Sequence, residues 1–274
     1  MWTFNLFISF IFDLLFAPVS GINDFWGMAF ISILTGIVMI FVYKYTSNQS
    51  GIRQSKNRIK AHFLEIRLFG DDWKSMLDSQ KNIFLSNLSY MKYALIPLCF
   101  IIIPVILIMI QLNLRYGYEP FKVGEHAVVS VKLDYSKDSR YADINLKVPQ
   151  NVVIDAPVLR INSTNEIDWR IKPEQPGTYD LEFELDNQKF TKKFVVTDKI
   201  TRISPLKSKA KIIDAFMNPA EDPLPADCHI ESININYKPA IMNIFSFKIH
   251  WIIVFFAISL IAGFSLKGFF NVEV

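Results

Sequence analysis

Histidine and cysteine, which supply most metal ligands and many nucleophiles, are few in this chain and widely spaced. They are His62, His126, His229, His250, Cys99 and Cys228. The histidines share no ligand spacing with Cys, Asp or Glu, so no metal site is expected. Cys99 lies inside an apolar run and Cys228 in a polar region, which makes a disulfide between them implausible. The sequence predicts neither a metal nor another cofactor.

Two groups of carboxylates have the residue types of a general acid and base, but each has a simpler interpretation. Glu182 and Glu184 alternate with apolar residues, so they occupy the solvent face of a predicted strand. Glu221, Asp222 and Asp227 lie in a polar loop. The chain has no phosphate-binding Gly-rich loop, no Gly-x-Ser-x-Gly motif and no His-Glu-x-x-His motif. A non-enzymatic protein is therefore expected.

Three apolar runs dominate the organisation of the chain. Residues 25–43 and 93–114 contain no charged residue. At about 1.5 Å per residue, each run can cross a hydrocarbon core about 30 Å thick. A third run, 248–267, is closed by Lys248 and Lys267. We predict three transmembrane helices, and their lack of internal charge argues against an ion-coupled transporter.

The first 24 residues are apolar and aromatic, but Asp13 and Pro18 interrupt them. A charge near the middle of a span is costly, and the turn before residue 25 would be tight. We therefore expect an interfacial amphipathic helix over 1–24, on the outer face of the membrane. A further span within residues 1–19 remains the alternative.

The segment 44–92 predicts a helical hairpin of coiled-coil type. Two apolar stripes at helical spacing flank a break at Gly70–Asp71: Ile52, Ile59, Phe63 and Ile66 before it, and Trp73, Leu77, Phe84, Leu88 and Met91 after it. The segment holds nine Lys or Arg against four Asp or Glu, which places it in the cytoplasm. The candidate contact residues for a cytoplasmic partner are Arg53, Lys56, Arg58, Lys60 and Arg67.

This orientation puts the N-terminus outside and the tail 268–274 in the cytoplasm. A plasma (inner) membrane location is the default for such a multi-pass protein. Residues 115–247 carry 18 basic and 19 acidic residues, and this near-neutral balance predicts no nucleic-acid surface.

Short segments with a period of two occupy 115–200. This pattern predicts an extracytoplasmic immunoglobulin-like β-sandwich, with a hairpin turn at Asp186–Asn187. Residues 201–247 contain several prolines and predict an extracytoplasmic linker, with a short helix around 210–216 and a strand around 230–237. The expected fold is an α+β multi-pass membrane protein with three transmembrane helices, a cytoplasmic helical hairpin and an extracytoplasmic sandwich.

The order of these parts resembles the YidC/Oxa membrane-protein insertase superfamily. The residues concerned are Phe12–Pro18 before the turn, Asn23–Gly27 leading into Ile33-Leu34-Thr35, Tyr43–Gln49 at the end of the first span, and Ile96-Pro97 and Ile103-Pro104-Val105 in the second. The likeness covers about residues 4–114, with the last span as the third core helix. The large sandwich between the second and third core spans is unusual for that family.

The resemblance implies a groove, open to cytoplasm and lipid, in which a client helix sheds its polar flank before entering the bilayer. The family's groove arginine corresponds to about Met39, which is apolar, and its glutamine before the second proline becomes Ile103. The candidate groove residues are Ser32, Thr35, Met39 and Ser259. The expected partners are the lipid bilayer and nascent membrane proteins or a companion subunit, with ribosome contact through the basic hairpin.

The function expected on this basis is that of an insertase-type membrane-protein biogenesis factor. The alternative is a non-enzymatic envelope interaction or adaptor protein, whose outer sandwich binds a partner. Polar residues that converge between the spans would favour the first function, and uniform apolarity would favour the second.

Overall fold

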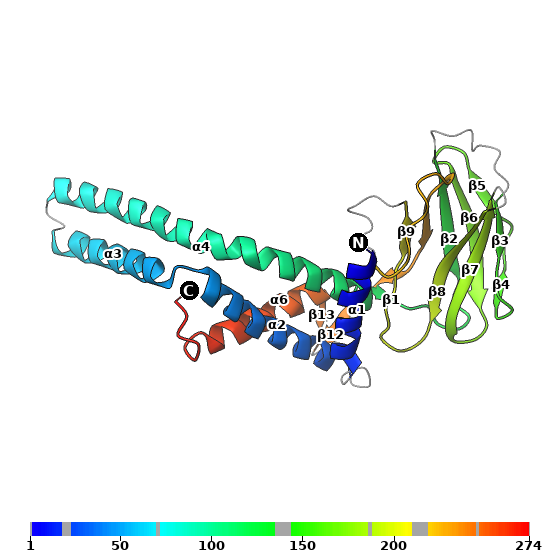
Figure 1. Cartoon of the computed structure of the whole chain (residues 1–274), viewed down its shortest axis with the longest axis horizontal. Coiled ribbons are helices and arrows are strands. Elements are labelled where there is room, and N and C mark those ends of the chain that lie inside the picture. The colour runs from blue at the N-terminus through cyan, green and yellow to red at the C-terminus, as the bar shows by residue number, and fades with distance from the viewer. Residues whose placement is uncertain are drawn as a thin grey trace. The chain divides into compact units, whose positions relative to one another are not determined.

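A computed structural model describes residues 2–17, 23–69, 72–134, 144–185, 188–209, 219–244 and 247–273. These residues form an α+β protein with several antiparallel sheets, as predicted (Figure 1). The chain divides into two compact units. Met1–Asp24 and Met109–Trp251 form what we call the β unit, and Phe25–Ile108 and Ile252–Val274 form the helical unit. The predicted helix around 210–216 and the turns at Gly70–Asp71 and Asp186–Asn187 lie outside the described residues.

The helices of the described residues are α1 (Trp2–Phe16), α2 (Asp24–Thr46), α3 (Gln49–Leu68), α4 (Trp73–Tyr116) and α6 (Trp251–Leu266). Helices α2 and α4 are long and apolar enough to cross a membrane. The third predicted span corresponds to α6, which is apolar but has only 16 residues. Its length is about 24 Å, somewhat less than a hydrocarbon core of about 30 Å.

The predicted second helix of the hairpin and the second span are one continuous helix, α4, of 44 residues. We expected two separate elements, with a boundary at residue 92. No Gly or Pro stands between Lys92 and Pro97, so nothing interrupts helix propagation there. Pro97 and Pro104 both lie inside α4.

The interior of the hairpin contains Ile52, a member of the predicted α3 stripe that is completely buried, together with small and polar side chains. A Cβ on Gly51 of α3 would lie 2.9 Å from the Tyr93 ring of α4, and Ser79 Oγ of α4 donates to Glu65 Oε2 of α3 at 3.0 Å. The predicted stripe on α4 is solvent-exposed, with Trp73 75% accessible. Sequence spacing identified a stripe but not which face of α4 turns toward α3.

Two antiparallel sheets form most of the β unit (Figure 1). The larger has the strand order β4-β6-β2-β10-β9, with β5 also paired to β6, and the smaller has the order β3-β7-β8. Their strands are β2 (Ala127–Leu133), β3 (Asn145–Lys147), β4 (Val152–Ile154), β5 (Leu159–Ile161), β6 (Glu166–Pro173), β7 (Gly177–Leu185), β8 (Gln188–Val196), β9 (Leu206–Ser208) and β10 (Ile230–Ile235). Two short pairs, β1 (Tyr118–Glu119) with β11 (Lys238–Pro239) and β12 (Met242–Ile244) with β13 (Phe247–Ile249), complete it.

One hydrophobic core lies between the two sheets. Alternate side chains of β2, including Val129 and Val131, are fully buried in it. The rings of Trp169 on β6 and Phe183 on β7 meet across the sheets with centroids 5.9 Å apart. The inward positions Leu181, Phe183 and Leu185 are those that the period of two indicates. At the start of β7, the Tyr179 hydroxyl donates to the Gln175 carbonyl at 2.8 Å.

Residues 201–247, which we expected to form a linker, belong to the β unit. The predicted strand around 230–237 is β10, which lies between β2 and β9 in the larger sheet. Ile230, Ile233 and Ile235 are completely buried. The register shifts between Ile230 and Ser232, so these isoleucines are spaced by three and then two residues. This bulge hides the alternation that identifies a buried strand in a sequence.

Candidate functional site

The helical unit contains an apolar cavity of about 320 Å³ between α2, α4 and α6. From α2 it is lined by Thr35, Gly36, Met39, Ile40 and Tyr43, from α4 by Leu98, Ile101 and Val105, and from α6 by Phe255, Phe256, Ser259, Leu260, Gly263 and Phe264. We call this cavity the groove. No lining residue carries a charge.

Three of the four candidate groove residues meet in this cavity. Thr35 and Met39 line it from α2, and Ser259 lines it from α6. Ser32 does not line it, because its side chain is completely buried and its hydroxyl donates to the Met28 carbonyl at 2.7 Å. Ile103, the other carried-over position, is exposed on α4 and does not line the groove either.

The hydroxyl groups of the groove are satisfied within their own helices. Thr35 Oγ1 donates to the Ile31 carbonyl at 2.8 Å, and Ser259 Oγ donates to the Phe256 carbonyl at 3.1 Å. Such bonds leave the hydroxyl with acceptor capacity but no free proton. The groove therefore offers a bound molecule mainly apolar contact.

Helices α2 and α6 approach each other closely beside the groove because of Gly36. A Cβ at this position would lie 2.6 Å from the Ser259 carbonyl oxygen and 3.0 Å from the Ala262 Cβ. Gly263, on α6, is less crowded, since its Cβ would lie 3.8 Å from the Gly36 carbonyl oxygen. Small residues of this kind allow the backbones of membrane helices to pack closely.

The five candidate contact residues all lie on α3, and four of them are exposed: Arg53, Arg58, Lys60 and Arg67. Lys56 differs, because its Nζ lies 3.8 Å from Glu273 Oε2 in the segment after α6. The same segment is held by the Glu273 backbone N–H, which donates to Gln49 Oε1 at 2.7 Å. The charge of Lys56 is thus partly compensated by Glu273 within the helical unit.

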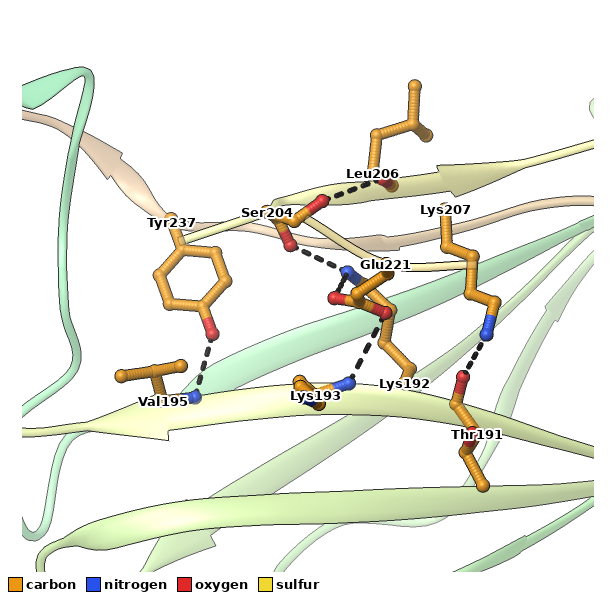
Figure 2. A network of polar contacts seen from close by, with 9 residues as sticks. All are labelled: Thr191, Lys192, Lys193, Val195, Ser204, Leu206, Lys207, Glu221 and Tyr237. Carbon is orange, nitrogen blue, oxygen red and sulfur yellow. Dashed lines mark hydrogen bonds and ion pairs between the residues drawn. The ribbon is translucent and has the colours of Figure 1, made fainter. Parts of the chain in front are cut away.

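The β unit contains a buried ion pair that sequence analysis did not identify (Figure 2). The Lys192 side chain is 0% exposed, and its Nζ lies 2.6 Å from Glu221 Oε1 and donates to the Ser204 carbonyl at 2.6 Å. Burial lowers the pKa of Lys192, and the Glu221 charge partly opposes that shift. The pair joins β8 to the loops before β9 and around residue 221.

Neighbouring hydrogen bonds extend this network along β8, as Figure 2 shows. The Val195 backbone N–H donates to the Tyr237 hydroxyl at 2.9 Å, and Lys207 Nζ donates to the Thr191 carbonyl at 2.7 Å. Burial also raises the pKa of Tyr237. The sequence signal for Lys192 was weak but present, because Phe190, Lys192 and Phe194 share the inward face of an alternating strand.

A second polar cluster in the β unit joins α1 to the last turns of α4. Arg115, whose side chain is 4% exposed, lies 2.5 Å from Asp13 and donates to both oxygens of Gln111. Arg202 lies 3.3 Å from the other oxygen of Asp13. Asp13, which interrupts an apolar segment of the sequence, is therefore the shared counter-ion of two guanidinium groups.

Among the described residues, no group of three or more His, Cys, Asp or Glu side chains is placed to hold a metal ion. No family model matches this chain, and neither does any curated protein.

Proposed function

We propose that this chain is an integral membrane protein of insertase type, in which α2, the apolar part of α4 and α6 surround a groove that holds an apolar segment of a client membrane protein. The observation that carries the proposal is the meeting of Thr35, Met39 and Ser259 in one cavity between three apolar helices. The resemblance to the YidC/Oxa superfamily assigns a client groove to this position.

The proposed topology places α3 and the adjoining part of α4 in the cytoplasm and the β unit outside. The excess of Lys and Arg between α2 and the apolar part of α4 supports this orientation. Helix α6 would be the third span, and its short length would be met by local thinning of the bilayer or by flanking residues such as Lys267.

For the β unit we propose an immunoglobulin-like sandwich. Reading β2, β3, β4, β6, β7 and β8 as strands B to G gives a D-E-B sheet and a C-F-G sheet, the order of the immunoglobulin fold. Strand β10 takes the place beside β2 that the first strand normally holds. The Tyr179 hydrogen bond to Gln175, at the start of β7, has the form of the tyrosine corner.

The groove would assist a client helix by providing apolar contacts for its side chains rather than by charge interactions. A client helix that enters the bilayer must pack its large apolar side chains while its polar flank is still being dehydrated. A cavity of about 320 Å³ is at the lower end of the roughly 300–1,000 Å³ typical of ligand sites, so it accepts a few side chains or part of an acyl chain.

The alternative is an adaptor that uses the β unit to bind an envelope partner and uses the helices only as an anchor. The self-satisfied hydroxyls of Thr35 and Ser259 favour it, because they provide little of the partial hydration implied for an insertase groove. On this alternative the groove would be filled by lipid. The two functions differ in what contacts Met39 during synthesis of membrane proteins.

Site-specific photocrosslinking tests this difference. We expect a photoreactive residue at Met39 to crosslink to short membrane proteins during their synthesis in the native host. The matched control is Val38, the adjacent α2 residue, which is 42% exposed and does not line the groove. Client crosslinks at least several-fold stronger at 39 than at 38 are expected. Equal crosslinks, or crosslinks to lipid alone at both positions, would contradict the client groove.

A second test concerns the exposed cations of α3. We expect the triple charge reversal Arg53→Glu, Arg58→Glu and Lys60→Glu to reduce co-purification of a cytoplasmic partner, such as ribosomes, because it removes an electropositive surface. Lys56 is left intact because of its ion pair with Glu273. The thermal unfolding of the β unit serves as the control and should not change. Unchanged co-purification would remove this role from α3.

A further inference from the structure

A polar pocket of about 220 Å³ lies beside the buried Lys192–Glu221 pair in the β unit. Unlike the lining of the apolar groove, its lining includes polar and charged side chains. It consists of Thr178, Lys193, Val195, Thr201, Arg202, Ser204, Ala220 and Glu221. A pocket of this size is smaller than most sites for drug-sized molecules, so it suits a small polar group.

The charges around the pocket sum to a positive excess. Glu221 is neutralised by Lys192 at 2.6 Å, so it adds no net negative charge. Arg202 and Arg115 share the single carboxylate of Asp13, which leaves one cation uncompensated. Lys193 is exposed and forms no ion pair within the described part of the chain, although Asp180 stands opposite it in the β7–β8 register. This excess favours an anion.

The remaining polar groups of the lining can donate hydrogen bonds to such an anion. Thr178 and Thr201 carry hydroxyls with a rotatable proton. Ser204 Oγ instead donates to the Leu206 carbonyl at 3.1 Å, so it is already engaged. A guanidinium, an ammonium and two hydroxyls are the donors that recognise a phosphate group.

The pocket lies next to the end of an apolar helix. The Ile203 backbone N–H, between two lining residues, donates to the Leu114 carbonyl in the last turn of α4 at 2.7 Å. Asp13, the partner of Arg202, belongs to α1, whose Phe10 and Leu14 are 66% and 67% exposed. In a membrane protein, these apolar side chains would be covered by acyl chains close to the pocket.

We propose that this pocket binds the phosphate of an anionic phospholipid headgroup, with Lys193 and Arg202 as its cationic ligands and the acyl chains lying along the exposed side of α1. The inference rests on the membrane location in the proposed function. The lipid would fasten the β unit to the membrane surface at the point where the chain leaves α4.

The test uses the detergent-purified full chain reconstituted in nanodiscs of phosphatidylcholine with a minority of phosphatidylglycerol. Native mass spectrometry measures how strongly phosphatidylglycerol is enriched among the lipids that remain bound. We expect Lys193→Gln to weaken this enrichment about tenfold, the effect of losing one charge-assisted hydrogen bond. The matched control is Lys189→Gln, on the same strand, where the exposed lysine pairs with Glu184 at 3.4 Å and does not line the pocket.

Two results would overturn the proposal. One is an enrichment that Lys193→Gln and Lys189→Gln leave equally unchanged. The other is saturable binding of inorganic phosphate in lipid-free detergent, sensitive to Lys193→Gln, with no enrichment of phosphatidylglycerol, because the ligand would then be a soluble anion. Alkaline extraction of native membranes distinguishes a failure of the membrane location from a failure of this lipid site alone. A chain that is extracted contradicts the membrane location itself, whereas a retained chain without lipid enrichment contradicts only this site.

Discussion

Glu221→Gln should lower the free energy of unfolding of the β unit by about 3–5 kcal/mol. The substitution keeps the shape of the side chain but leaves the Lys192 ammonium buried without a counter-charge, at a position that is 0% exposed. Urea unfolding of the detergent-solubilised full chain, followed by near-ultraviolet circular dichroism, measures the loss.

Two further variants make this prediction specific. The pair Lys192→Met with Glu221→Leu removes both charges and should recover most of the lost stability, because buried ion pairs can be replaced by apolar side chains at little cost. Glu184→Gln breaks an ion pair with Lys147, whose side chain is 58% exposed, and should cost much less, because solvent screens an exposed pair. A loss as small for Glu221→Gln as for Glu184→Gln would show that the buried pair does not organise the β unit.

The deficit of Glu221→Gln should shrink as the pH rises. Burial lowers the pKa of Lys192 below the ordinary value of 10.5, and removal of the Glu221 charge strengthens that shift. Between the folded-state pKa of Lys192 and 10.5, the unfolded chain binds more protons at Lys192 than the folded chain does. This window begins at a lower pH in the variant than in the parent protein, because the variant lacks the Glu221 charge. The free energy of unfolding therefore rises with pH in this window. A deficit independent of pH up to 10 would contradict the assignment of the loss to Lys192.

Gly36→Ala should disturb the groove more than a methyl group added at any other glycine in the helix contacts described above. The new Cβ would stand 2.6 Å from the backbone oxygen of Ser259, so α2 and α6 must move apart rather than one side chain rotate. Overpacking of this kind costs about 1–3 kcal/mol. Thermal denaturation of the full chain in detergent should show a lower midpoint, and Met39 crosslinks should weaken.

Gly263→Ala is the matched control, on the facing helix. Its Cβ would lie 3.8 Å from the Gly36 carbonyl oxygen, which is ordinary van der Waals contact. We expect a change within about 0.5 kcal/mol and unchanged crosslinks. If both alanines behave alike, close packing at Gly36 is not what shapes the groove.

The groove and the Lys192–Glu221 pair differ in how far they can be predicted from the sequence. Thr35, Met39 and Ser259 were found through a resemblance, because no periodicity marks them as neighbours across 224 residues of chain. The Lys192–Glu221 pair was missed because a lysine on an alternating strand is normally solvated, and only the tertiary contacts with Ser204 and Glu221 remove it from water. Burial of a side chain by residues distant in sequence depends on the tertiary structure.

The sequence by itself determined the local structures that rest on periodicity and length. The two long apolar helices, the basic hairpin segment and the alternating strands β2, β6, β7 and β8 follow from patterns within one element. Tertiary structure decided which faces are buried. It placed β10 inside the sheet despite a bulged pattern, turned the α4 stripe of Trp73 to solvent and made Asp13 the counter-ion of Arg115 and Arg202. The physical reason is that burial and charge pairing depend on neighbours distant in sequence, whereas helical and strand periods depend only on adjacent residues.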